Sequence, residues 1–212
     1  MENINIDKKS EKKFFIFIGR SGCGKGTQSE MLISYLESKY KAASNDITVT
    51  YATTGAGFRQ LISSDSYAAR LSKEITNNGG LNPEFLAIWN WSNIFINNLS
   101  DNQTVVLDGA PRKMIEVEAL HTAINFFKYT SPIVVYIDVS ERWAKSRLLA
   151  RGREDDKNEA EVSLKMSWFE KDVMPCVDYY KNTDIRYNFV HVNGEKSPQE
   201  VHDELIYKLE NI

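Results

Sequence analysis

The chain has 212 residues, enough for one domain of ordinary size. Its 26 Lys and Arg against 29 Asp and Glu leave a formal net charge of −3, which argues against a general nucleic-acid binder, and its 42% of hydrophobic residues excludes a disordered chain. No apolar run approaches the ~18 residues of a membrane span, so we expect a soluble, cytoplasmic protein that binds neither membrane nor nucleic acid.

A polar segment at residues 1–13 predicts a flexible tail ahead of a single domain at 14–212. Short apolar runs rich in Val, Ile, Phe and Tyr then punctuate the chain, at 14–18, 47–52, 104–108, 133–139 and 185–192. Most of these runs are continuous rather than alternating, which predicts strands buried on both faces.

Between the runs lie segments with helical spacing, at 25–40, 83–99, 116–127, 141–151, 159–181 and 198–210. We expect Asn82 to cap the second helix, with Pro83 and Glu84 in its first turn, and Pro175 to end or kink the fifth. Strands that alternate with helices predict an α/β fold: a three-layer α/β/α sandwich with a central five-stranded parallel sheet. Ligands of such sheets bind where the strands end.

The segment GRSGCGKGT at residues 19–27 follows the first predicted strand and matches the pattern G-x-x-x-x-G-K. Glycines let backbone N–H groups surround a phosphate, and the next helix directs its positive end at the same anion. The pattern predicts a site for the phosphates of ATP that is formed by Gly22, Cys23, Gly24, Lys25, Gly26 and Thr27. The alternative is a glycine-rich turn with one exposed lysine.

From Lys25 onward the run Gly-Lys-Gly-Thr-Gln resembles the adenylate kinase family of P-loop nucleoside monophosphate kinases, and the likeness extends over residues 14 to about 210. After the second strand, TTGAGFR at 53–59 is similar to the family's Thr-Gly-Asp-x-x-Arg segment, with Ala56 in place of Asp. The resemblance implies that Thr54 and Gly55 lie beside the acceptor nucleotide and that Arg59 holds its phosphate.

After the third strand, DGAPR at 108–112 resembles the family's Asp-Gly-aromatic-Pro-Arg, with Ala110 in place of the aromatic residue. The resemblance implies that Asp108 holds Mg²⁺ directly or through water, and that Arg112 clamps phosphate. It also implies that the Gly109 carbonyl accepts from the adenine amino group. An ordinary β-turn is the alternative.

Glu116 stands where AMP-specific relatives carry a Gln that reads adenine. A carboxylate only accepts hydrogen bonds, which suits guanine, whereas Thr54 and Gly109 suit adenine. We expect AMP to be preferred with reduced discrimination against GMP. The alternative is that Glu116 is a first-turn helix acid that never touches the base.

An arginine-rich segment follows the fourth strand. Arg147 and Arg151 are four residues apart and share a helix face, and residues 152–156 resemble a very short form of the family's lid. The resemblance implies that Arg147, Arg151, Arg153 and Lys165 surround the donor and the transferred phosphoryl group. Lys165 stands in place of an Arg. A solvated, charged helix is the alternative.

The resemblance implies an adenylate kinase that transfers the γ-phosphoryl group of Mg·ATP to AMP and forms two ADP. It implies a helical acceptor lobe near 53–82, a minimal lid near 152–156, Gly194 near the donor adenine, and a monomer. With only Cys23 and Cys176 the chain has no cysteine set for zinc. The alternatives are a kinase for GMP or for several acceptors, a degenerate relative with poor turnover, and a P-loop protein that only hydrolyses nucleotide slowly.

Overall fold

Five parallel strands form the centre of the molecule, in the order β2-β3-β1-β4-β5. The computed structural model describes residues 12–78, 80–152, 159–182 and 186–212. The strands are β1 (Phe14–Ile18), β2 (Thr48–Thr53), β3 (Gln103–Asp108), β4 (Ile133–Asp138) and β5 (Asn188–Asn193). Each lies within two or three residues of a predicted apolar run, and the predicted α/β class is confirmed.

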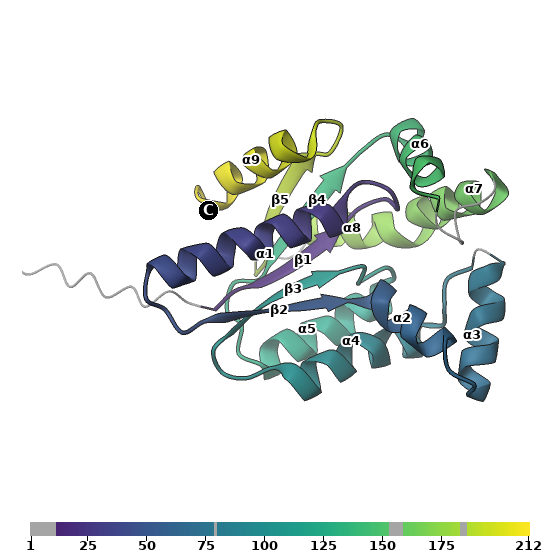
Figure 1. The fold of residues 1–212 in the computed structure, drawn as a ribbon, viewed down its shortest axis with the longest axis horizontal. Helices are drawn as coiled ribbons and strands as arrows, with labels where there is room; N and C mark the ends of the chain where they lie inside the picture. The colour runs from purple at the N-terminus through teal and green to yellow at the C-terminus, as the bar shows by residue number, and fades with distance from the viewer. Residues whose placement is uncertain (1–11, 79, 153–158, 183–185) are drawn as a thin grey trace, which may run out of the picture.

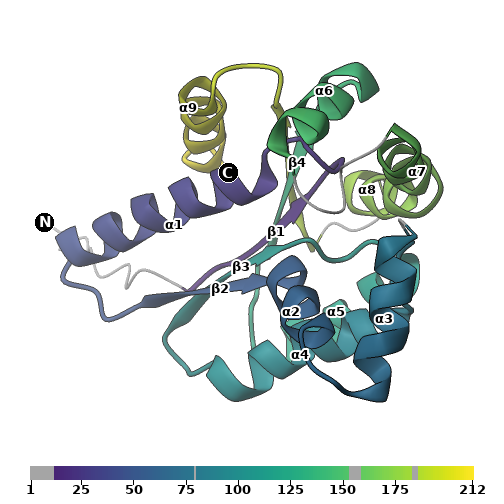
Figure 2. The same ribbon diagram turned by 45° about the vertical axis from the view of Figure 1, so that its right-hand side comes forward.

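Helices cover both faces of the sheet and make the three layers visible in Figures 1 and 2. The helices are α1 (Lys25–Ala42), α2 (Thr54–Ile62), α3 (Tyr67–Asn77), α4 (Glu84–Asn98), α5 (Met114–Phe126), α6 (Glu141–Arg151), α7 (Glu159–Trp168), η2 (Phe169–Val173), α8 (Met174–Asn182) and α9 (Pro198–Leu209). Among the described residues, α1, α6, α7 and α9 pack on one face, and α4, α5, η2 and α8 pack on the other.

The side chains of β1 show why this run is continuously apolar. Phe15 and Phe17 enter the core beneath α1, whereas Phe14, Ile16 and Ile18 enter the core beneath α4 and α5. All five are at most 3% exposed. Alternate residues of a strand point to opposite faces, so a central strand with helices on both sides needs apolar residues at every position.

The predicted helix at 159–181 is divided into three segments. A π-helical turn, η2, separates α7 from α8, and Pro175 lies in the first turn of α8. Proline has no N–H and its ring crowds the carbonyl four residues earlier, which explains a wider turn just before it. The expected cap at Asn82 is wrong: Pro83 is the N-cap of α4, and the Asn82 amide donates to Thr76 Oγ1 at 3.3 Å.

The expected tail at residues 1–13 does not include Lys12 and Lys13, which contact the body of the protein. Lys13 N donates to Thr104 Oγ1 at 3.0 Å, and Lys13 O accepts from Val105 N. Lys12 Nζ donates to Phe127 O and lies 4.8 Å from the centre of the Tyr129 ring. These contacts attach both lysines to the end of the sheet, so the hydrogen-bonded chain begins before β1.

The lobe expected near 53–82 contains α2 and α3. Ser66 caps α3 through a hydrogen bond from Ala69 N, at 3.1 Å. Buried Asn90 of α4 donates to Thr54 O at 2.9 Å, and this bond ties the start of α2 to the main body. The first turn of α2 is therefore fixed to the main body.

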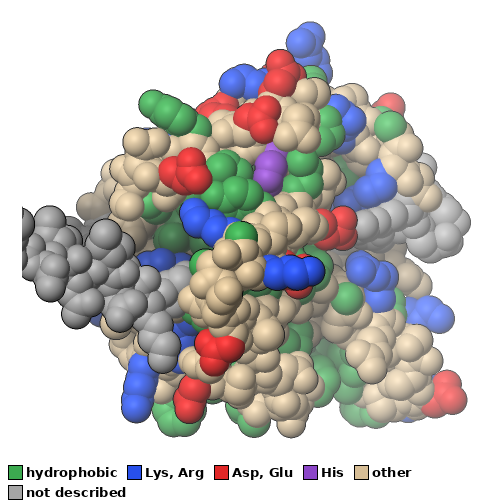
Figure 3. Space-filling view, turned by 60° about the vertical axis from the view of Figure 1, so that its left-hand side comes forward, with side chains coloured by type: hydrophobic (Ala, Val, Ile, Leu, Met, Phe, Trp, Pro, Cys, Tyr) green, Lys and Arg blue, Asp and Glu red, His purple; other side chains and the backbone are tan. Residues whose placement is uncertain are grey.

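Charges of both signs are interspersed on the face shown in Figure 3, as the near-neutral composition leads one to expect. In the part of the chain that the structure describes, no helix is both long and apolar enough to cross a bilayer.

Candidate active site

A cleft of about 570 Å³ opens at the carboxyl ends of the strands. Most of the residues predicted for the site line it: Gly22, Cys23, Gly24, Lys25, Gly26, Thr27, Gly55, Arg59, Asp108, Gly109, Arg112, Arg147, Arg151, Lys165 and Gly194. They come from six separate parts of the chain, and most of them meet because parallel strands end at one edge of the sheet. Arg153 and residues 154–158 lie outside the described residues.

The loop between β1 and α1 is shaped to hold an anion. Gly22 and Gly24 have positive φ angles of 86° and 96°, which residues other than glycine rarely adopt. Gly24 is the N-cap of α1, so the unpaired N–H groups of that helix begin at the cleft. Lys25 Nζ donates to Gly19 O and Arg20 O, both at 2.9 Å, and Lys25 lines the cleft.

Cys23 contributes to the loop by its backbone. Its side chain is 4% exposed and belongs to the core beneath α1. Burial raises the pKa of the Cys23 thiol, although the nearby Lys25 charge opposes this. A buried neutral thiol is a poor nucleophile.

The cleft is strongly cationic among the described residues. Seven Lys and Arg side chains line it, against the carboxylates of Glu30 and Asp108. Such an excess of positive charge favours polyanions and concentrates them in the cleft.

Three of these cations converge on a second cavity of about 20 Å³, which lies beside the phosphate loop. Lys25 from the loop, Arg112 from the turn after β3 and Lys165 from α7 all line it, together with Trp168. Lys165 is only 5% exposed, and Arg112 Nε donates to Gly109 O at 3.0 Å. A space of about one water molecule between three cations suits a group that carries concentrated negative charge.

Thr54 and Glu116, expected beside the acceptor base, do not line either cavity. Both are 3% exposed. Thr54 Oγ1 lies 3.5 Å from Asp108 O, and Glu116 Oε1 accepts from Arg112 N at 3.3 Å. The structure therefore places both side chains behind the cleft wall, in contact with the residues that form it.

One carboxyl oxygen of Glu116, Oε2, is buried without a hydrogen-bond partner among the described residues. Burial raises the pKa of the Glu116 carboxyl, and this outweighs the opposing effect of Arg112. A protonated carboxyl both donates and accepts, as a Gln amide does.

Sequence reasoning missed Tyr51, Trp143, Trp168 and Lys196, which also line the main cleft. The Tyr51 hydroxyl donates to Asp108 Oδ2 at 3.2 Å, and burial together with the Asp108 charge raises the pKa of Tyr51. The Arg112 guanidinium lies 6.0 Å from the centre of the Trp168 ring. None of the four belongs to a motif, and only the period-two pattern of β2 could have placed Tyr51 on one face of its strand.

Comparison with known proteins identifies the family. A sequence model of the family described as adenylate kinase matches residues 17–185. An adenylate kinase of Prochlorococcus marinus strain MIT 9515 is 31% identical over 185 residues, which cover 87% of this chain and 92% of the relative. Adenylate kinases of Oenococcus oeni and Nostoc sp. are each 27% identical, over 87% and 90% of this chain and 92% and 95% of their own. The cationic cleft thus lies in a chain that belongs to the adenylate kinase family.

Proposed function

We propose that this protein is an adenylate kinase, which reversibly transfers the γ-phosphoryl group of ATP to AMP and forms two ADP. The observation that carries the proposal is that Lys25 of the phosphate loop shares one cleft of about 570 Å³ with Arg59 and Arg112, which follow the two neighbouring strands. A hydrolase needs only a donor site, whereas a transferase must also hold an acceptor phosphate. The similarity to adenylate kinases over most of the chain supports the same activity.

We assign the residues by their place around the main cleft. The phosphate loop and Lys25 hold the donor phosphates, and Arg112 with exposed Arg59 holds the acceptor phosphate. Lys165 and Arg151 stabilise the negative charge that spreads over the phosphoryl group during transfer. No covalent intermediate is needed, since positioning and charge account for this kind of reaction.

The donor set near the loop fits Mg²⁺ carried by the nucleotide. Mg²⁺ binds through one or two carboxylates, phosphate oxygens and several waters. Asp108 supplies one carboxylate at the end of β3, and a Cβ atom on Gly26 would lie 3.7 Å from its Oδ2, so the phosphate loop runs beside it. The ion would neutralise phosphate charge, and Asp108 would hold it directly or through water. No three His, Cys, Asp or Glu side chains group as metal ligands among the described residues.

Substituting Tyr51 by Phe is expected to raise the Mg²⁺ concentration for half-maximal activity roughly 3- to 10-fold, because Asp108 loses the hydrogen bond that orients it. The measurement is activity and MgATP binding across a Mg²⁺ titration. Tyr136→Phe is the matched control, since Tyr136 makes the same kind of bond, at 2.9 Å, to Asp138 at the end of β4, outside the cleft. Equal shifts in both variants would contradict the role given to Tyr51.

Substituting Glu116 by Gln is expected to raise the ratio of kcat/KM for AMP to that for GMP. Glu116 lies behind the cleft wall, so this prediction requires the acceptor base to reach past Arg112 to Glu116 Oε2, which has no hydrogen-bond partner among the described residues. A Gln amide there donates to adenine N1 and accepts from its amino group at any pH, whereas Glu116 does both only when protonated. Burial raises the pKa of Glu116, so its carboxyl stays protonated to a higher pH than a free carboxyl does. The protonated form suits adenine. The parent's ratio of kcat/KM for AMP to that for GMP should therefore fall as the pH rises through that pKa. The variant's ratio should stay flat. If the AMP/GMP ratio of the parent and of the variant changes with pH in the same way, Glu116 does not read the base and its role is to accept the hydrogen bond from Arg112 N.

The acceptor is identified by initial rates with MgATP and each of AMP, GMP, CMP and UMP, beside a reaction without acceptor. We expect AMP to react fastest and GMP measurably, with only slow hydrolysis in the absence of acceptor. If the rate of ATP consumption is the same with and without every acceptor, the protein is a slow hydrolase. If GMP reacts fastest, the enzyme is a guanylate-preferring kinase.

The lobe near 53–82, which contains α2 and α3, is our proposed acceptor lobe. Most of the minimal lid expected at 152–156 falls outside the described residues. The cytoplasmic location and the monomeric state stay predictions.

A further inference from the structure

Arg20 belongs to the phosphate loop, yet its side chain lines neither cavity of the site. The pattern G-x-x-x-x-G-K leaves this position open to any residue. The Arg20 side chain is 15% exposed, and it contacts the chain after β4 and the turn η2. It can therefore act on the reaction only through the groups that it holds.

We propose that Arg20 is a positioning residue: it fixes the segment that carries Lys165 and Trp168 against the phosphate loop, and so holds Lys165 beside the transferred phosphoryl group. The inference rests on the proposed function, because it explains how one of the charges assigned there is kept in place. Arg20 touches neither nucleotide in this arrangement, so its effect on turnover passes through Lys165.

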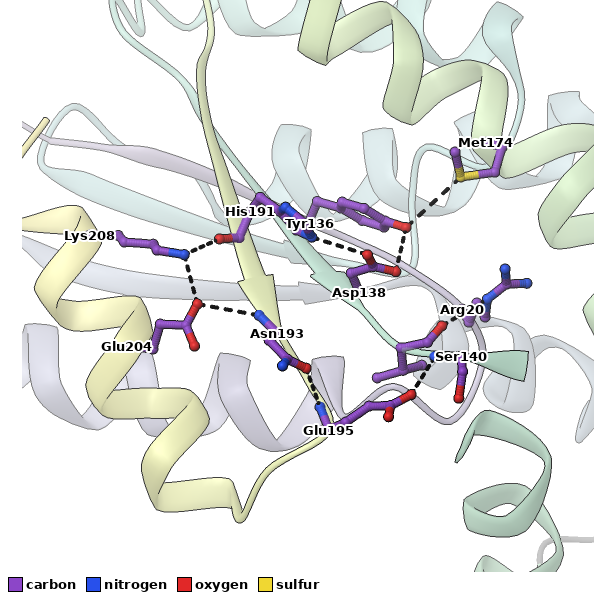
Figure 4. Close-up of polar contacts among 11 residues, drawn as sticks. Arg20, Tyr136, Asp138, Ser140, Met174, His191, Asn193, Glu195, Glu204 and Lys208 are labelled. Atoms are coloured by element: carbon purple, nitrogen blue, oxygen red, sulfur yellow. Dashed lines mark hydrogen bonds and ion pairs between the residues drawn. The ribbon is translucent and has the colours of Figure 1, made fainter. Parts of the chain in front are cut away.

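The guanidinium of Arg20 joins two separate parts of the fold. Arg20 Nε donates to Val139 O at 3.1 Å, just after β4 (Figure 4). Arg20 Nη2 donates to Glu170 Oε1 of η2 at 2.5 Å, and the guanidinium lies 4.1 Å from the centre of the Phe169 ring, which is buried. Since the Glu170 side chain is 58% exposed, we expect this ion pair to contribute less than the contacts with Val139 and Phe169.

The backbone of the same residue holds the lysine of the loop. Arg20 O accepts from Lys25 Nζ at 2.9 Å. Lys25 lines the small cavity together with Lys165 and Trp168 of α7 and Phe169 of η2. Arg20 therefore connects Lys25, through its carbonyl, to the segment that carries Lys165, through its side chain.

Stability alone does not account for an arginine at this place. Arg20 Nη1 is buried and has no hydrogen-bond partner among the described residues. A buried polar atom without a partner lowers stability, and an apolar side chain of similar length would fill the same space without that loss. A guanidinium, in contrast, can bond to a carbonyl and a carboxylate and stack on a ring at once, which fixes the orientation of η2 against the loop.

The test measures kcat at saturating MgATP and AMP, and the Kd of MgATP by calorimetry, for Arg20→Met, Lys165→Met and the double variant. A displacement of about 1 Å in a positioned group can lower turnover about 100-fold, so we expect kcat of Arg20→Met to fall about tenfold. The Kd of MgATP should stay within about twofold, because Arg20 lines neither cavity. In the Lys165→Met background, Arg20→Met should lower kcat by less than about twofold more, because the group that it positions is already absent.

Lys39→Met is the matched control. Lys39 Nζ, near the C-terminal end of α1, lies 3.8 Å from Glu210 Oε1 and 5.4 Å from the centre of the Tyr35 ring. It therefore combines an ion pair with a ring contact, as Arg20 does, but it lines neither cavity. We expect its kcat to equal that of the parent.

Three results would overturn the proposal and leave the proposed function standing. If Arg20→Met lowers kcat by the same factor with and without Lys165, Arg20 does not act through Lys165. An equal loss of MgATP affinity and of turnover, with a lowered Tm, would make Arg20 a packing residue of the loop. Unchanged kcat in folded Arg20→Met would show that the segment stays in place without it. If the parent transfers no phosphoryl group to AMP, the proposed function itself fails, and this inference fails with it.

If Arg20→Met does not fold, Arg20→Lys decides the question. Lysine keeps the charge but loses the planar fork, so it cannot make the carbonyl bond and the ring contact together. We expect kcat to fall in Arg20→Lys, and to fall less in the Lys165→Met background. No fall, or falls of equal size in the two backgrounds, would overturn the proposal.

Discussion

Substitution of Lys25 by Met is expected to lower turnover at least about 100-fold while the protein stays folded. Lys25 begins α1 at the phosphate loop, and it brings a positive charge to the cleft. Met has a side chain of similar length without that charge, so the transferred phosphoryl group loses an electrostatic contact in the transition state. The measurement is kcat with ATP and AMP, beside far-UV circular dichroism.

The fold should tolerate this change because, among the described residues, Lys25 Nζ bonds within its own loop: strongly to Gly19 O and Arg20 O, and weakly to Cys23 Sγ at 3.7 Å. Two lost hydrogen bonds cost about 1–3 kcal/mol, which lowers the Tm of a chain of this length by several degrees. Lys41→Met, at the exposed far end of α1, is the control. Near-normal turnover by folded Lys25→Met would show that the loop is not the donor site.

Substitution of Arg112 by Ala is expected to lower kcat/KM for AMP about 10- to 150-fold and to leave the KM for ATP nearly unchanged. A charge-assisted hydrogen bond to phosphate contributes about 1.5–3 kcal/mol, which corresponds to that range. Arg112 lines both cavities, between Gly109 O and the Trp168 ring. The variant should be measured at saturating ATP across a range of AMP concentrations, and at saturating AMP across a range of ATP.

Two further variants sharpen this result. Arg112→Lys keeps the charge but loses the two-pronged fork, so it should recover only part of the lost activity. Arg59→Ala should weaken the use of AMP in the same sense. Arg70→Ala is the control, because exposed Arg70 of α3 bonds to Asp65 O and lines neither cavity. If Arg112→Ala raised only the KM for ATP, its place on the acceptor side would be wrong.

The strands and most helices could be predicted because their causes are local. Continuous apolar runs mark strands that are covered on both faces, and the period of 3.6 marks helices that have one buried side. The strand order and the π-turn η2 could not be predicted in this way. They depend on which segments pack together, and on how the chain before Pro175 adjusts so that Phe169 and Val173 reach the core.

The candidate site likewise contains residues that a local motif predicts and residues that only the folded chain brings together. Lys25, Asp108 and Arg112 could be predicted because each belongs to a motif at the carboxyl end of a strand: Asp108 ends β3, Arg112 lies in the turn after it, and Lys25 begins α1 after the loop that follows β1. The motifs predict Thr54 and Glu116 at the surface of the cleft, because burial cannot be deduced from a motif. In the structure both side chains are buried behind the cleft wall. Tyr51, Trp143 and Trp168 were missed because only the folded chain brings them to the phosphate loop.

The most direct test of the central claim, that one cleft holds a donor and an acceptor phosphate together, uses ATP labelled with ³²P at the γ-position. After reaction with unlabelled AMP and Mg²⁺, the products are separated and the label is counted in ADP and in inorganic phosphate. We expect nearly all transferred label in ADP, and we expect omission of AMP nearly to abolish the release of label from ATP. Label that appears as inorganic phosphate at the same rate with and without AMP would contradict the claim.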